Sequence, residues 1–324
     1  MSDLGARVRA GDLSAAPAVL NLLENRTAAA RAKTAELLAE LSPAALGGEA
    51  PGHVVGVTGP PGSGKSTLLS RLVAGWRARG DSVAVLAVDP SSRRSGGALL
   101  GDRARIEHDP ADPATFIRST AAGTRLGGLA PATRAAAAAL AVCFDVVVIE
   151  TVGVGQSETE VADVADTVAV VVQPGSGDAL QFLKAGIMEV PDVLVVSKAD
   201  LGRIAQRALA DVRAALRSLG ARETPALAVS SVPPASGIAD LLAALDEHRQ
   251  ALDLRARRLG ARRAHALADF ADEYGERGLR ALGGRREAER WLASCDPTLS
   301  VPSLIQLLER RQGVDAPNRR HSAP

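Results

Sequence analysis

The stretch that decides the fold is residues 53–66, HVVGVTGPPGSGKS, in which a run rich in valine passes directly into a glycine-rich loop. The loop matches the pattern G-x-x-x-x-G-K-[ST], and a helical pattern follows it as far as Arg79. A strand, this loop and a helix in that order predict a phosphate-binding loop, because glycines let backbone N–H groups wrap around phosphate oxygens. The residues expected to bind nucleotide are Gly59, Pro60, Pro61, Gly62, Ser63, Gly64, Lys65, Ser66 and Thr67.

Three side chains at the end of this loop have distinct expected roles. Lys65 is expected to reach the β- and γ-phosphates and to stabilise charge during catalysis. The Ser66 hydroxyl is expected to ligate Mg²⁺, and Thr67 is expected to lie over the α-phosphate.

Further along the chain, short β-rich runs alternate with helical patterns. The runs are continuous in Val and Ile, which is typical of parallel strands buried on both faces of a sheet. Strands separated by helices predict an α/β fold with a doubly wound, mostly parallel sheet. The predicted strands are HVVGVT (53–58), SVAVLAV (82–88), DVVVIE (145–150), TVAVVVQ (167–173), DVLVVSK (192–198) and ALAVSS (226–231).

The chain divides into three predicted segments. Residues 1–48 carry leucines at roughly helical spacing and end at turn signals, so they form an N-terminal helical segment. Residues 49–250 form the phosphate-loop domain, and residues 251–324 form an arginine-rich helical extension with a flexible tail.

Composition excludes several classes of protein. The 324 residues are 46% hydrophobic and 23% charged, so the chain can bury a sizeable core. A net charge of +1 and an aromatic content of 2% argue against a nucleic-acid partner. Without an apolar run that could span a bilayer or act as a signal sequence, we expect no membrane partner and a cytoplasmic location. The two cysteines, Cys143 and Cys295, lie outside any metal-ligand spacing.

The stretch Ser197-Lys198-Ala199-Asp200, at the end of a predicted strand, points to guanine. The Asp200 carboxylate can accept hydrogen bonds from N1–H and the exocyclic amine of guanine, whereas adenine would leave it unpaired. Lys198 is expected to lie along the base plane. Ser197 stands where GTPases usually carry Asn, and it cannot make the two-sided contact of an amide. A second base loop is expected at the end of the next strand, at Ser230, Ser231 and Val232.

Several stretches together closely resemble the MeaB/ArgK/MMAA family of P-loop GTPases. They are VVGVTGPPGSGKSTLLSRL, DPSS, SGGALLGDRAR, LGGLAPATR, ETVGVGQSE, QPGSGDALQFLKAGIMEV and SKAD, which cover about residues 50–250. Family members are chaperones of adenosylcobalamin-dependent acyl-CoA mutases, such as methylmalonyl-CoA mutase. The resemblance therefore implies a GTPase that binds GTP or GDP with Mg²⁺, takes such a mutase as its partner and forms a homodimer through its C-terminal helices. The apolar residues that could form that interface could equally close a core within one chain. They are Leu259, Leu267, Phe270, Tyr274, Leu279, Leu282, Trp291, Leu292, Leu304 and Leu307.

The resemblance also assigns roles to residues outside the phosphate loop. Asp89, Asp102 and Glu150 are the acidic groups expected near Mg²⁺. Asp102, in the segment that resembles the first switch, and Glu150, at a strand end, are also expected to act on the attacking water. Gly153 allows the backbone to approach the γ-phosphate. The sequence departs from the family at Arg93-Arg94, where Pro and an apolar residue are usual.

A third switch is implied for residues 173–189. Within it Gln181 and Lys184 lie about one helical turn apart and are expected to share a face that contacts the partner and acts in catalysis. The alternative is a solvated helix with no such role.

The expected reaction is in-line attack of water on the γ-phosphate, slow in the isolated protein because no residue looks like a strong general base. Three alternatives compete with this interpretation. A non-catalytic nucleotide-binding scaffold is disfavoured by the intact Lys65, Ser66, Asp89 and Glu150. A GTPase for nickel insertion would need clustered Cys and His ligands, and the five histidines are dispersed. A kinase-like NTPase of a transport system would need a phosphoacceptor, which the sequence does not supply.

Overall fold

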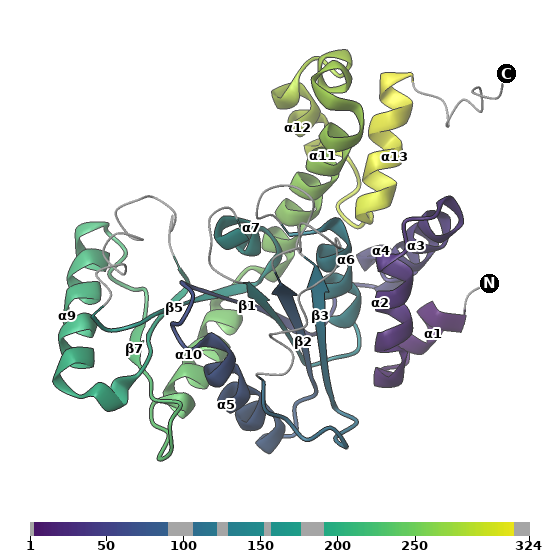
Figure 1. Cartoon of the computed structure of the whole chain (residues 1–324). Helices are drawn as coiled ribbons and strands as arrows, with labels where there is room; N and C mark the ends of the chain where they lie inside the picture. The colour runs from purple at the N-terminus through teal and green to yellow at the C-terminus, as the bar shows by residue number, and fades with distance from the viewer. Residues whose placement is uncertain (1–2, 90–105, 122–128, 152–156, 176–190, 314–324) are drawn as a thin grey trace, which may run out of the picture.

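The computed structural model describes residues 3–89, 106–121, 129–151, 157–175 and 191–313. Their strands form one parallel sheet of seven strands in the order β3-β2-β4-β1-β5-β6-β7 (Figure 1). The predicted α/β fold with a doubly wound parallel sheet is therefore confirmed. In sheet order the strands are β3 (Thr115–Ala121), β2 (Val83–Asp89), β4 (Val146–Thr151), β1 (His53–Thr58), β5 (Thr167–Val172), β6 (Val193–Val196) and β7 (Ala226–Ala228).

Helices cover both faces of the sheet, and a further group of helices lies at each end of the chain. The N-terminal group is α1 (Asp3–Arg9), α2 (Ala16–Glu24), α3 (Ala28–Glu40) and α4 (Pro43–Leu46). The helices against the sheet are α5 (Lys65–Ala78), α6 (Pro131–Leu140), α7 (Ser157–Val164), α9 (Arg203–Ser218) and α10 (Ile238–Ala251). The C-terminal group is α11 (Leu254–Ala281), α12 (Arg285–Ser294) and α13 (Val301–Gln312).

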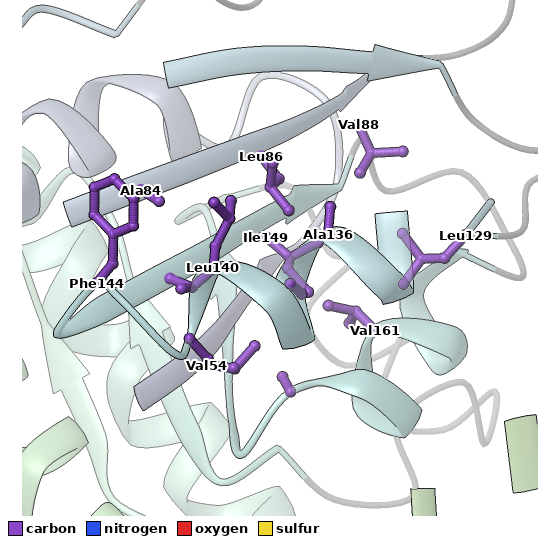
Figure 2. Close-up of a cluster of buried hydrophobic side chains, with 14 of the residues drawn as sticks. Val54, Ala84, Leu86, Val88, Leu129, Ala136, Leu140, Phe144, Ile149 and Val161 are labelled. Carbon is purple, nitrogen blue, oxygen red and sulfur yellow. The ribbon is translucent and has the colours of Figure 1, made fainter. Parts of the chain in front are cut away.

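The alternation of strand side chains divides the core of the sheet into two layers. Val54 and Ile149 point to the layer that α6, α7 and α9 cover, and part of this cluster is drawn in Figure 2. Val55 and Val148 point to the opposite layer, which α5 and α10 cover. Because both faces are buried, the central strands need apolar residues at nearly every position, which explains their continuous Val and Ile runs.

Six of the seven strands are predicted from the sequence, and β3 is not. Its sequence, TFIRSTA, interrupts the apolar pattern with polar residues. Among the described strands β3 pairs with β2 alone and lies at the edge of the sheet, where polar residues are tolerated. The side chain of Arg118 bonds to Asn21 at 2.9 Å and to Glu24 at 2.5 Å on α2. The polar residues therefore dock the N-terminal helices on the sheet edge.

The C-terminal helices close a core of their own within one chain. Leu267, Phe270, Leu292 and Leu304, from α11, α12 and α13, are buried together in one cluster. Packing within the chain is one of the two uses that the sequence left open for these apolar residues, and the homodimer stays a prediction. Among the described residues no helix is long and apolar enough to cross a membrane.

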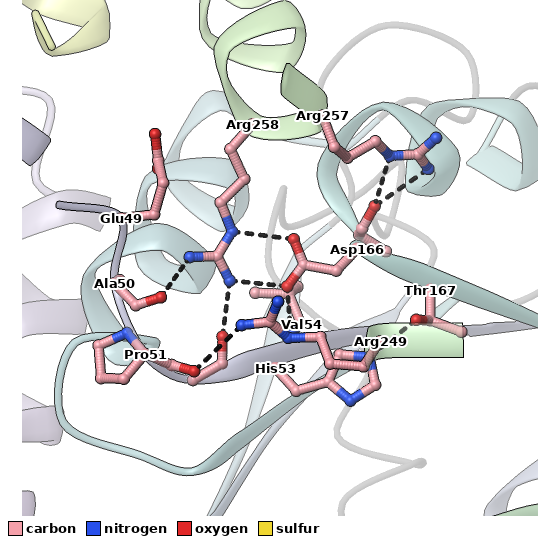
Figure 3. Close-up of polar contacts among 12 residues, drawn as sticks. Glu49, Ala50, Pro51, His53, Val54, Asp166, Thr167, Arg249, Arg257 and Arg258 are labelled. Carbon is pink, nitrogen blue, oxygen red and sulfur yellow. Dashed lines mark hydrogen bonds and ion pairs between the residues drawn. The ribbon is translucent and has the colours of Figure 1, made fainter. Parts of the chain in front are cut away.

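The guanidinium of Arg258 helps to fasten α11 to the amino-terminal edge of the sheet (Figure 3). Arg258 bonds to both oxygens of Asp166, at 2.9 and 2.7 Å, and to the carbonyls of Ala50 and Gly52, each at 2.6 Å. Asp166 also accepts a 2.9 Å hydrogen bond from the backbone N–H of Val54. Asp166 is 1% exposed, so this carboxylate joins β1, β5 and α11 away from water.

We expect Asp166→Ala to lower the free energy of unfolding by about 3–5 kcal/mol, because it leaves the buried charge of Arg258 unpaired. Urea unfolding followed by circular dichroism measures this loss. Asp246→Ala is the control, since it breaks the pair between Asp246 and Arg79, whose side chains are 42% and 39% exposed. That pair contributes at most about 1 kcal/mol. Equal losses in the two variants would contradict the role given to Asp166.

Candidate functional site

The candidate site lies at the edge of the sheet where the parallel strands end. The phosphate loop follows β1, Glu150 lies near the end of β4, and Gln173 follows β5. The Ser197–Asp200 loop follows β6, and Ser230 lies just beyond β7. In sheets of this kind ligands bind in the crevice outside the carboxyl ends of the strands.

The phosphate loop has the backbone that its glycines predict. Gly59 has a φ of 144°, and a Cβ there would overlap the carbonyl oxygen of Val171 in β5. Helix α5 begins at Lys65, so its N-terminus and the N–H groups of its first turn are next to the loop, as anion binding requires. The Lys65 ammonium donates to the carbonyls of Gly59 and Pro60, at 2.7 and 3.1 Å. The buried Ser63 hydroxyl has no hydrogen-bond partner within the described chain.

A hydroxyl and a carboxylate meet beside this loop. Ser66 Oγ donates to Glu150 Oε1 at 3.1 Å, although 84 positions separate the two residues. Glu150 is 3% exposed and is held in register between Val57 of β1 and Ala87 of β2. β2 ends at Asp89, whose side chain lies outside the described structure. The oxygen ligands that Mg²⁺ prefers are therefore present at the strand ends.

The predicted base loop contacts the phosphate loop directly. Lys198 has a left-handed backbone with a φ of 54°. Its ammonium donates to the carbonyl of Gly62 at 3.0 Å and to Gln173 Oε1 at 2.7 Å. Asp200 accepts a 2.9 Å hydrogen bond from the hydroxyl of Ser230, so the two predicted base loops are joined.

The remaining predicted base-binding residues, Ser197, Ser231 and Val232, differ in burial and in their contacts. Ser197 is 5% exposed, and its hydroxyl donates to the carbonyl of Val172 at 3.1 Å, so its side chain ties β6 to β5. The carbonyl of Ser231 accepts a 3.0 Å hydrogen bond from Arg71 of α5. Val232 is 55% exposed at the outer end of the loop.

Two residues of this site were not predicted as base-binding residues from the sequence, although Gln173 begins the predicted third switch. Gln173 holds the ammonium of Lys198, and its place directly after β5 is a signal that could have found it. Arg71 holds the second base loop from α5, and its contact with Ser231 spans 160 positions, which no local pattern indicates. Four predicted residues, Asp102, Gly153, Gln181 and Lys184, lie outside the described residues, as do Arg93-Arg94.

Comparison with known proteins identifies the family. The family model described as "Methylmalonyl Co-A mutase-associated GTPase MeaB" matches residues 16–277. The chain belongs to the MeaB family. A relative from Mycobacterium bovis, named "Probable GTPase", is 41% identical over 256 residues, which are 77% of this chain and 75% of the relative. The resemblance seen in the sequence is thereby confirmed.

Other relatives match over less of their length. A Pyrococcus abyssi protein is 46% identical over 201 residues, 62% of this chain and 60% of that protein, so this chain spans less than two thirds of it. A Caenorhabditis elegans protein named "Methylmalonic aciduria type A homolog, mitochondrial" is 44% identical over 151 residues, 45% of this chain and 37% of that protein. A solved structure of a LAO/AO transport system kinase has a TM-score of 0.59 and 29% identity, with 90% of this chain and 95% of that chain covered.

We expect Gly59→Ala to lower the free energy of unfolding by about 3 kcal/mol, because a Cβ would displace the carbonyl of a buried strand and meet an unfavourable φ. Gly62→Ala is the matched control. Gly62 also has a positive φ, 76°, but nothing lies within 4 Å of the place that a Cβ would take, so only about 1 kcal/mol is expected. Urea unfolding measures the loss of unfolding free energy in each variant. Equal losses would show that the close approach of β5 to Gly59 does not restrict the side chain at that position.

Proposed function

We propose that the chain is a Mg²⁺-dependent GTPase that serves as a chaperone of an adenosylcobalamin-dependent acyl-CoA mutase. The observation that carries the GTPase part is the hydrogen bond from Lys198 to the carbonyl of Gly62, 3.0 Å long. It places a loop of the guanine-binding type against a phosphate-binding loop, so one nucleotide can span both. Membership of a family described as mutase-associated supports the choice of partner.

Guanine selectivity is assigned to Asp200. Ser230 donates to one carboxylate oxygen, Oδ1, at 2.9 Å and thereby fixes the direction of the group. A carboxylate in that position accepts from the two N–H groups of guanine and rejects adenine, which offers an acceptor instead. Lys198, held by Gln173, covers the base.

The residues around Ser66 fit Mg²⁺, since its hydroxyl already meets the carboxylate of Glu150. Ser66 would hold the ion directly, and Glu150 with Asp89 would hold it through water, because Mg²⁺ keeps several waters in nucleotide sites. When bound, Mg²⁺ neutralises negative charge on the β- and γ-phosphates. Lys65 stabilises charge on the same phosphates, and Glu150 orients water at the end of β4. Asp102 is proposed to act on the same water.

The mutase is proposed to accelerate hydrolysis by contacting the switch segments, through Gln181 and Lys184. The bound nucleotide then controls how the chain acts on the mutase. This requires contacts between the chain and the mutase that differ between the GTP and GDP states. In the proposal the chain acts as a homodimer. Its role is to gate cobalamin loading and to protect the mutase.

We expect the purified protein to release phosphate from GTP slowly and from ATP at least about 100-fold more slowly, because adenine leaves Asp200 unpaired. Asp200→Asn should reverse the preference from GTP to XTP, since an amide N–H matches the carbonyl that xanthine carries in place of the amine. Phosphate release with Mg²⁺ measures both. Equal use of ATP and GTP would contradict the assignment of Asp200, and phosphate on a protein instead of in solution would favour a kinase.

We expect methylmalonyl-CoA mutase holoenzyme to raise the rate of GTP hydrolysis by about 10-fold or more, because a contact that supplies charge or closes a switch lowers the barrier. Lys184→Ala should remove most of this acceleration. Lys33→Ala, at an exposed position of α3, is the control and should be accelerated fully. A mutase that leaves the rate unchanged would overturn the choice of partner and leave the GTPase intact.

A further inference from the structure

The second base loop presents two backbone N–H groups to which no described residue offers an acceptor. The loop runs from Ser230 to Ser236, and these two residues exchange 3.0 Å hydrogen bonds, each N–H donating to the carbonyl of the other. The N–H groups of Ser231 and Val232 form no hydrogen bond with any other described residue, and the two prolines that follow carry no N–H. Ser231 is partly exposed and Val232 is 55% exposed, so this part of the loop is open to a ligand.

Arg71 fixes the peptide group that joins these two residues. Its Nε donates to the carbonyl oxygen of Ser231 at 3.0 Å. The peptide bond between Ser231 and Val232 is trans, so the N–H of Val232 points in the direction opposite to that carbonyl oxygen, and hence away from the guanidinium. Arg71 therefore sets the direction of a hydrogen-bond donor that it does not itself contact.

The charge and the position of Arg71 both strengthen this arrangement. A guanidinium is always protonated in proteins, and a hydrogen bond from a charged donor is roughly twice as strong as one between neutral groups. Such a bond polarises the peptide group of Ser231, which makes the N–H of Val232 a better donor. Arg71 also belongs to α5, which begins at Lys65 beside the phosphate loop, so the second base loop is held by the same helix that is expected to bind the phosphates.

Val232 lies close to the carboxylate of Asp200. The Ser230 hydroxyl oxygen is 2.9 Å from Asp200 Oδ1 and 3.4 Å from the carbonyl oxygen of Val232, so this one hydroxyl lies between the two residues. In guanine the acceptor O6 is attached to the ring carbon next to N1. A group that donates to O6 must therefore lie beside the group that accepts from N1–H, which is the role given to Asp200. Adenine carries an amine at the same position, and an amine N–H cannot accept from a backbone N–H.

We propose that Arg71 is a positioning residue for guanine specificity, which holds the N–H of Val232, with that of Ser231 beside it, for O6 of the base. Arg71 contacts the loop and not the nucleotide. The inference rests on the proposed function, because Asp200 must bind the guanine edge for O6 to lie beside it. It adds a second recognition of the base, at O6, which depends on a side chain outside both base loops.

GDP and 6-thio-GDP form the test pair, since they differ only at atom 6, where sulfur is a weaker acceptor than oxygen. Isothermal titration of the full-length protein, at a slightly acidic pH where N1 of both bases keeps its proton, gives the two dissociation constants. The unaltered protein should bind GDP about fivefold more tightly, the value of one hydrogen bond. Arg71→Ala should weaken GDP by about that factor and leave 6-thio-GDP nearly unchanged. Mere damage to α5 would weaken both nucleotides equally and preserve their ratio.

Two further variants and a second readout complete the test. Arg71→Lys keeps a charged donor and should retain most of the preference for GDP over 6-thio-GDP. Arg217→Ala removes an arginine at an exposed position of α9 and should retain all of it. The amide proton of Val232 gives a readout that does not depend on the size of sulfur, because GDP should shift its resonance downfield in the ¹⁵N-labelled protein and not in Arg71→Ala.

The outcomes separate this inference from the proposed function. A preference for GDP over 6-thio-GDP that persists in a folded Arg71→Ala protein would overturn the role of Arg71 and leave the assignment of Asp200 intact. Equal affinity of the unaltered protein for GDP and 6-thio-GDP would likewise overturn the recognition of O6 alone. Equal affinity for GDP and ADP would overturn the assignment of Asp200 as well.

Discussion

The parallel pairing of β1 with β4 on one side and β5 on the other is the constraint on which the candidate site depends. Parallel strands end at the same edge of a sheet, so each loop that leaves this edge enters one crevice. That arrangement brings Ser66 within hydrogen-bond distance of Glu150 and brings Lys198 to the carbonyl of Gly62, contacts that span 84 and 136 positions of the chain. Burial of both sheet faces then holds the strand ends in place.

Local patterns in the sequence were enough to predict most of the sheet and the centre of the site. The phosphate loop is contiguous, so its glycines and Lys65 could be recognised without tertiary information. The central strands were visible because burial on both faces makes them apolar throughout. β3 was missed because an edge strand needs no such pattern, and its Arg118 serves α2 instead.

Other features depend on contacts that no local pattern encodes. Arg71 reaches Ser231 from a helix whose sequence indicates only an amphipathic segment. The alanine run of α6 indicates an apolar helix, and only the docking of α3 and α13 opposite it leaves a cavity between these helices. The C-terminal leucines were compatible with an interface or a core, and only the arrangement of α11, α12 and α13 in space shows that part of this set packs within one chain.

The hydrogen bonds of Arg258 to Asp166 and to the carbonyls of Ala50 and Gly52 have a consequence for synthesis of the chain on the ribosome. The carbonyls of Ala50 and Gly52 precede Arg258 by 208 and 206 positions. At about 5–20 residues per second, roughly 10–40 s pass between translation of the acceptors and of their donor. Asp166 precedes Arg258 by 92 positions, so for about 5–20 s its carboxylate has no guanidinium to neutralise it, although the entire phosphate loop has already been made. A nascent or truncated chain that ends before Arg258 consequently lacks these contacts at the amino-terminal edge of its sheet. That edge then unfolds locally more often, and cellular proteases act on locally unfolded segments.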